Sequence, residues 1–174
     1  VGKNSIGIYG YEVTGNGGNI TVGDNGTGIF SKGGNVTLNG GKLTVGNGKA
    51  AGVLTNGSGQ TIISTADVQL GNSKSYGFVI KGSGTNADIN DADGTKLNNE
   101  SVFMYSSDKT SNVINRTALE STGNKNYGLY SSGNVKNLAD INFGIGLGNV
   151  GIFSVEDGTA VNGDPGLATQ PVIT

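Results

Sequence analysis

The chain has 174 residues, with 33 Gly, 14% charged residues, a formal net charge of -2, and neither Cys nor His. This composition excludes Ser-His and Cys-His catalytic pairs and zinc held by imidazole or thiolate. The 11 Lys and Arg residues are scattered along the chain, so we expect no nucleic-acid partner. Clumps of Val, Ile and Thr between Gly-rich turns indicate an ordered β protein.

One short phrase, a small residue followed by two apolar residues and usually Ser or Thr, recurs along the chain. It occupies residues 7–10, 28–31, 52–55, 77–80, 103–106, 128–131 and 151–154. The first residues of these phrases are 21, 24, 25, 26, 25 and 23 positions apart, and Phe103 stands where the other repeats have Gly. A constant period with one phrase per repeat is typical of a stacked architecture.

The repeat that begins at residue 28 gives the plan of one coil. Residues 28–31, 35–38 and 42–45 are predicted strands, and the last two alternate polar and apolar residues. Gly-rich and Asn-Gly turns at residues 32–34, 39–41 and 46–48 separate them. Three strands and three turns per coil predict an all-β, three-sided parallel β-helix of about seven coils over residues 1–161. Residues 162–174 lose the pattern and form an irregular tail or the start of a next coil.

Like residues of successive coils are expected to stack in interior columns. Val22, Val45 and Leu70 form one such column, and Ile20, Leu43 and Val68 form the next. The second side is expected to use Ile62, Ile63, Ile89, Val113, Ile114, Val135 and Leu138, and the last full coil Ile141, Phe143, Ile145 and Leu147. Asn at the turns either forms amide ladders along the rod or only tolerates turn dihedral angles. These Asn residues are Asn35, Asn39, Asn47, Asn56, Asn72 and Asn134.

An apolar column is predicted on the first strand of each coil. Strict alternation places Tyr76 and Tyr127 on the core face, with Phe78 and Leu129. The opposite face then carries one side chain per coil, and an outward column would be a stripe for partner binding. Two alternatives are that the rings point inward beside the Gly residues and that another part of the parent protein covers them. The candidate binding residues of this column are Tyr9, Phe30, Tyr105, Tyr130 and Phe153, with Leu54 completing it.

Asp88, Asp91 and Asp93 form the one acidic cluster that the sequence suggests. Carboxylates so placed could act as a glycosidase pair or hold calcium. No acidic residue follows where the bidentate calcium ligand would fall. The alternative without a function is a solvated turn that lengthens this coil. We therefore expect no catalytic residue, no cofactor and, apart from this weak calcium candidate, no metal site.

The phrases at residues 28–31 and 35–41 resemble the passenger domains of large type V autotransporters, above all the fusobacterial autotransporter adhesins. The resemblance covers most of residues 1–160. It implies a right-handed β-helix at the bacterial cell surface that holds a binding tip away from the cell. It also implies a signal peptide and an outer-membrane barrel outside this chain, and it supplies no catalytic residues.

The first functional hypothesis is a segment of a bacterial surface adhesin that serves as a stalk or a binding face and is not an enzyme. Its partners would be a host or bacterial surface protein or glycan, together with the rest of the passenger and its barrel. A β-helical polysaccharide lyase or hydrolase and a self-associating rod are the alternatives. The pattern is already under way at Val1, so we expect a piece excised from a longer protein, anchored at the surface or secreted.

Overall fold

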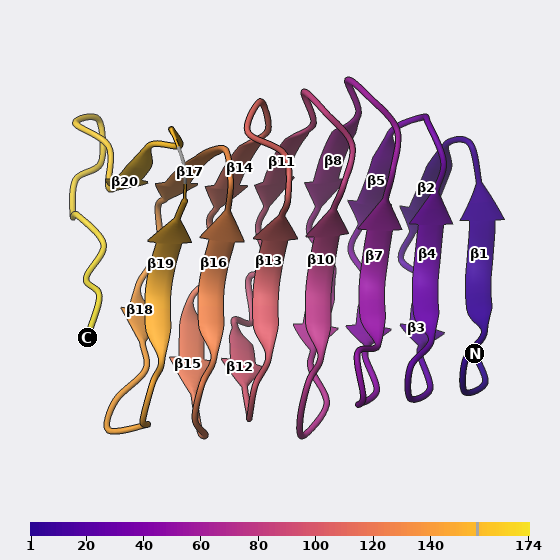
Figure 1. Cartoon of the computed structure of the whole chain (residues 1–174), viewed down its shortest axis with the longest axis horizontal. Coiled ribbons are helices and arrows are strands. Elements are labelled where there is room, and N and C mark those ends of the chain that lie inside the picture. Colours follow the sequence, from indigo (N-terminus) through magenta and orange to yellow (C-terminus); the bar gives the residue numbers. More distant parts are fainter. Residues whose placement is uncertain (156) are drawn as a thin grey trace.

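The computed structural model describes residues 1–155 and 157–174. They form a three-sided parallel β-helix (Figure 1). In this view the chain climbs the front strands, crosses to the back, descends, and advances toward the C-terminus, which is the sense of a right-handed coil. The predicted fold class is therefore confirmed, with seven strands stacked on the first side. No helix in the described part is long and apolar enough to cross a membrane.

Each side of the prism is built from strands of successive coils. The first side is one sheet of β1 (Ile6–Gly10), β4 (Thr27–Ser31), β7 (Ala51–Thr55), β10 (Tyr76–Ile80), β13 (Val102–Ser106), β16 (Tyr127–Ser131) and β19 (Val150–Ser154). The second side is one sheet of β2 (Val13–Asn16), β5 (Val36–Asn39), β8 (Thr61–Ser64), β11 (Asn86–Ile89), β14 (Asn112–Asn115), β17 (Asn134–Asn137) and β20 (Ala160–Asn162).

The third side is divided into two sheets. The first contains β3 (Asn19–Thr21), β6 (Lys42–Thr44) and β9 (Asp67–Gln69), and the second contains β12 (Thr95–Leu97), β15 (Leu119–Ser121) and β18 (Ile141–Asn142). The C-terminal tail continues this side beyond β18, because the Ile141 N–H donates to the Val172 carbonyl at 2.9 Å and the Phe143 N–H to that of Thr174 at 2.8 Å.

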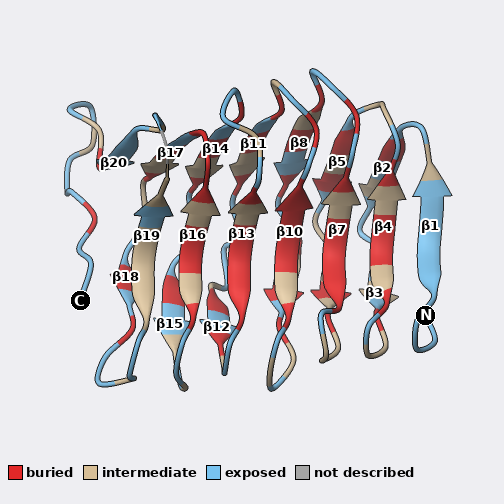
Figure 2. Ribbon diagram, viewed as in Figure 1, coloured by how far each residue is buried: buried red, intermediate tan, exposed pale blue. Residues whose placement is uncertain are grey.

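The predicted interior columns of the third side are present. Ile20 lies opposite Leu43, which lies opposite Val68 on the next strand. Val22, Val45 and Leu70 are buried, at 2%, 1% and 9% exposure, in the same apolar core. Figure 2 shows buried residues along the strands of all three sides, with exposed residues concentrated at the turns and the two ends. Each coil therefore covers the apolar surface of its neighbours.

The first strand of each coil departs from strict alternation at its Gly position. The register of the first side omits this position, and a Cβ on Gly52 would lie only 2.6 Å from Leu43 Cδ2 inside the coil. Phe103 occupies the same position and is fully buried against Phe78, with ring centroids 5.8 Å apart. Two consecutive residues thus face the core, and the residue before them turns outward. The prediction that Tyr76 and Tyr127 join the core face is therefore wrong.

Two groups of predicted core residues also lie outside. On the second side, Ile62, Ile89, Val113 and Val135 are buried, but Ile63 is 46% exposed and Ile114 stacks in the same outer column, one strand beyond Asp88. Each pair of adjacent apolar residues can place only one side chain inside an unkinked strand.

In the last full coil, Ile141 and Phe143 are buried whereas Ile145 and Leu147 are exposed. The reason is local backbone geometry: β18 is only two residues long, and the chain turns at Gly144, where φ is 51°. The two predicted core positions therefore fall in the turn that follows the strand.

Amide ladders run along the rod, as predicted for some of the turn Asn residues. On the outside, Asn39 donates to Asn16 at 2.9 Å, and Asn134 donates to Asn112 at 3.0 Å. A second ladder, missed in the sequence, lies inside the coil. There Asn115 donates to Asn137 at 2.8 Å, and Asn137 donates in turn to Asn162 at 2.7 Å. Pairing removes the penalty that buried amides otherwise carry.

Substitution of Phe103 by Gly, which restores the repeat phrase, is expected to destabilise the protein. The ring fills interior space, and its removal leaves a cavity that costs about 3–5 kcal/mol. Urea unfolding measures the change in the free energy of unfolding. Ile63→Thr is the matched control, since Thr14 and Thr37 occupy the same outer column, and it should shift that free energy by less than about 0.5 kcal/mol. Equal effects of the two substitutions would contradict the interior placement of Phe103.

Candidate functional site

The outer face of the first side carries the predicted column. Its members lie opposite one another in consecutive strands, in the order Tyr9, Phe30, Leu54, Val79, Tyr105, Tyr130 and Phe153. Tyr9 is 62% exposed and Phe153 38% exposed, while Phe30, Tyr105 and Tyr130 are half-buried. All five predicted stripe residues therefore face outward, and the alternative in which the rings line the interior is wrong. Their role in binding stays a prediction.

The rings of this column stack because parallel strands hold them about one strand spacing apart. The Tyr105 and Tyr130 centroids are 5.2 Å apart with planes at 25°, and those of Tyr130 and Phe153 are 5.0 Å apart. Tyr127, turned outward by the kink, meets Tyr130 edge-on at 5.6 Å. Tyr76 meets Tyr105 in the same manner at 6.5 Å. Tyr76 and Tyr127 thus widen the stripe. Strict alternation of the strand residues would have placed both of them in the core.

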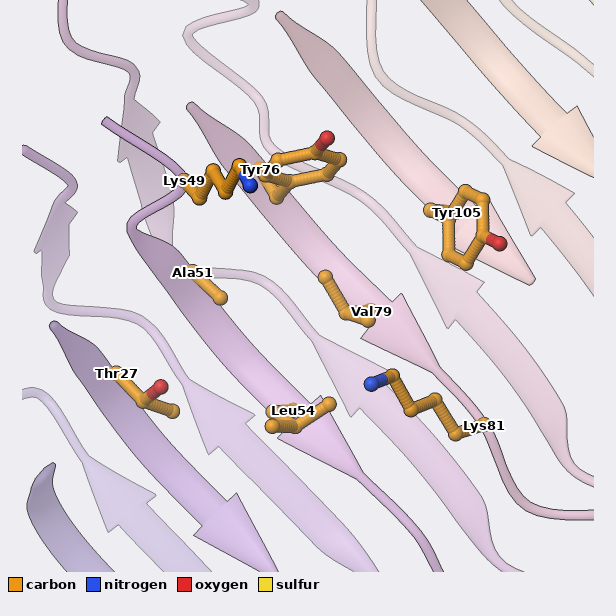
Figure 3. A pocket seen from close by; sticks show the side chains of 8 residues that line it. All are labelled: Thr27, Lys49, Ala51, Leu54, Tyr76, Val79, Lys81 and Tyr105. Atoms are coloured by element: carbon orange, nitrogen blue, oxygen red, sulfur yellow. The ribbon is translucent and has the colours of Figure 1, made fainter. Parts of the chain in front are cut away.

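A hollow interrupts the stripe where two coils carry aliphatic side chains. Leu54 and Val79 stand where the neighbouring coils have rings. In the next outward column, Ala51 has only a methyl side chain where the following strand has Tyr76. The hollow has a volume of about 360 Å³ and is open on the outer face (Figure 3). The residues that line it are Thr27, Lys49, Ala51, Leu54, Tyr76, Val79, Lys81 and Tyr105. The aliphatic break in an otherwise aromatic column is a sequence signal that would have located it.

Charge in this hollow is entirely positive. Lys49 lies just before β7 and Lys81 just after β10, so their ammonium groups stand at opposite ends of the hollow. Both side chains are exposed, and none of the ion pairs among residues 1–155 and 157–174 includes either of them. Burial, reinforced by the neighbouring Tyr130 and Tyr76, raises the pKa of the Tyr105 phenol. The Tyr105 hydroxyl therefore keeps its proton at neutral pH and can donate a hydrogen bond.

The predicted acidic cluster is assembled differently from the expectation. Asp88 lies on the outer face of the second side, where Arg116 Nε donates to its Oδ1 at 2.8 Å. Asp91 and Asp93 instead meet Asp67 from the preceding coil, with carboxylate oxygens within 4.8 Å of one another. Asp67 also lies 3.4 Å from Lys42 Nζ. The grouping of Asp88 with the other two carboxylates is therefore wrong.

Asp91 has a structural task at the break in the third side. It is only 2% exposed, so the interpretation of a solvated turn is wrong for this residue. Its Oδ2 accepts the Val68 N–H at 3.0 Å and the Thr95 hydroxyl at 3.0 Å, and its Oδ1 accepts the Asp93 N–H at 3.0 Å. Strands β9 and β12 do not pair, and the carboxylate satisfies the backbone donor that the break exposes.

Comparisons with protein-family models, curated proteins and solved structures found no match to this chain. Among the described residues, the outer face of the first side is where rings, hydroxyl groups and unpaired cations lie together.

Replacement of Asp91 by Asn is expected to destabilise the break. The amide NH₂ cannot accept, so at least one buried donor loses its partner, at a cost of about 1–3 kcal/mol. Urea unfolding reports the total, and amide hydrogen exchange at Val68 should quicken. Asp93→Asn is the control, because the Asp93 side chain is exposed and its backbone N–H is retained. An Asp91→Asn protein as stable as the control would contradict this role.

Proposed function

We propose that this chain is a β-helical segment of a bacterial surface adhesin and that the outer face of its first side binds the receptor. The observation that carries the proposal is the outward aromatic column from Tyr9 to Phe153, supported from below by a continuous sheet. A run of exposed rings on one face is the kind of surface that marks an interaction site. Tyrosine is enriched at such sites because it combines a large apolar ring with a hydroxyl.

The same construction suits a stalk. Every interior strand of the first side is hydrogen-bonded to the coil before and the coil after, so the rings are held at fixed intervals along the rod. A rigid platform lowers the entropy cost of binding, since few side chains must be ordered on contact. The receptor would be a surface protein or glycan of a host cell or another bacterium. A membrane anchor, in this proposal, lies in a part of the protein beyond this chain.

The arrangement of the carboxylates favours adhesion over the alternative of a polysaccharide-active enzyme. An acid and base pair needs two carboxylates free to exchange protons across a substrate. Asp88 is engaged with Arg116, and both oxygens of Asp91 accept hydrogen bonds inside the fold. A depolymerisation assay on acidic glycans, with and without calcium, tests that alternative directly.

A Tyr105→Ser/Tyr130→Ser double variant should bind receptor-bearing cells about tenfold more weakly or worse, because interface tyrosines commonly dominate binding. Attachment of the labelled chain to cells or to receptor arrays measures the effect. Circular dichroism should show the fold retained, as both rings lie on the outer face.

The matched control is Ile63→Thr/Ile114→Thr, which removes two outward apolar side chains from the second side. Unchanged attachment by the tyrosine variant, or an equal loss in the control, would contradict a binding role for the stripe. Sedimentation of the unmodified chain at rising concentration tests the self-association alternative.

A further inference from the structure

The hollow in the aromatic stripe has the features of a ligand site rather than of an accidental gap. Concave sites typically combine apolar walls with a few converging polar groups. Here the floor is made by Ala51, Leu54 and Val79, and the polar groups around it are two ammonium groups, two phenol groups and the Thr27 hydroxyl (Figure 3).

One ring offers a free face to this hollow. Tyr105 is stacked on Tyr130 on one side, at 5.2 Å and 25°. On its other side the column continues with Val79, which is too short to stack, so that face of the ring is open toward the hollow. Tyr76 stands almost perpendicular to Tyr105, at 84°, and forms an adjoining wall. A flat apolar face beside a perpendicular wall fits the C–H face of a sugar ring.

The charges select among sugars. Lys49 and Lys81 extend over the hollow from opposite strand ends, and no carboxylate of the described chain pairs with them. The outward positions of the strands beneath carry no charged residue. Two uncompensated ammonium groups favour an anion, and a charge-assisted hydrogen bond to a carboxylate is stronger than a neutral one.

The backbone argues against an extended peptide in this place. Strands β7 and β10 are paired with neighbours on both sides, so their N–H and C=O groups are already used. A peptide strand could not extend the sheet here, whereas the hydroxyl groups of a sugar can use the Thr27 and tyrosine hydroxyls and the lysines.

We propose that this hollow binds a carboxylated sugar unit of a glycan, with its apolar face on Tyr105 and its carboxylate held by Lys49 or Lys81. The inference rests on the proposed function, since it names the receptor chemistry of the adhesive face. The shared chemistry, a pyranose bearing a carboxylate, occurs in sialic-acid termini and in uronic-acid polysaccharides.

The test is isothermal titration of the purified chain with sialyllactose, a hyaluronan hexasaccharide and, as the uncharged comparison, lactose. At least one acidic sugar should bind, and it should bind at least tenfold more tightly than lactose. The two acidic probes separate the two sources. Added salt should weaken the binding because the lysines are exposed.

Two variants test the geometry. Lys49→Gln/Lys81→Gln removes both charges and should weaken binding about tenfold or more. Its control is Lys32→Gln/Lys125→Gln, because Lys32 follows β4 as Lys81 follows β10, and Lys125 shares with Lys49 the left-handed turn before a strand. Val79→Phe fills the hollow with a ring that continues the stack and should abolish binding while the fold is kept.

The proposal is overturned if neither acidic sugar binds, if lactose binds equally well, or if the two double-lysine variants behave alike. If binding is absent while Tyr105→Ser/Tyr130→Ser still reduces cell attachment, the glycan inference fails and the adhesive function stands. If attachment is also unaffected, both fail.

Discussion

The in-register stacking of one coil on the next is the constraint on which the whole molecule depends. With no cysteine and no described helix, a coil is held mainly by the backbone ladder and the thin apolar lining that it shares with its two neighbours, with side-chain ladders such as the Asn115–Asn137 pair added to them. Register fixes which side chains meet, so each position along the repeat becomes a column. The buried apolar column through Leu43, the buried amides beginning at Asn115 and the outward rings ending at Phe153 all follow from this single rule.

Most of the architecture could be predicted from the sequence, because the period and the turn residues are written in every repeat. Alternation misplaced Tyr76 and Tyr127 because it assumes an unbroken pleat. The departure lies at the Gly position that follows each of these tyrosines, and the sequence shows it only where Phe103 replaces that Gly. Asp67 escaped notice for a different reason. It lies 24 residues before Asp91, and these two residues become neighbours only when one coil is placed on the next.

The features that single out this rod are departures from its repeat. Five of the seven outward side chains of the column are aromatic, and the hollow exists because Leu54 and Val79 are not. A repeat protein can thus form a hollow on its surface where two successive repeats have shorter side chains, without an inserted loop or a change in the backbone. The column itself could be predicted from the sequence because its apolar residue recurs in every repeat, although its direction stayed open. The hollow could not be predicted in this way, because it lies where two coils depart from the aromatic pattern.

The split third side makes the rod mechanically uneven. Two walls carry continuous ladders from end to end, whereas the third is interrupted between β9 and β12 and bridged there by the carboxylate of Asp91. A beam with one cut wall flexes most readily toward or away from that cut. The same two coils carry Leu54 and Val79 on the first side, so the interruption and the hollow lie at the same level of the rod. The floor of the hollow keeps the unbroken pairing of β7 with β10, and bending at the interruption therefore leaves that floor in place.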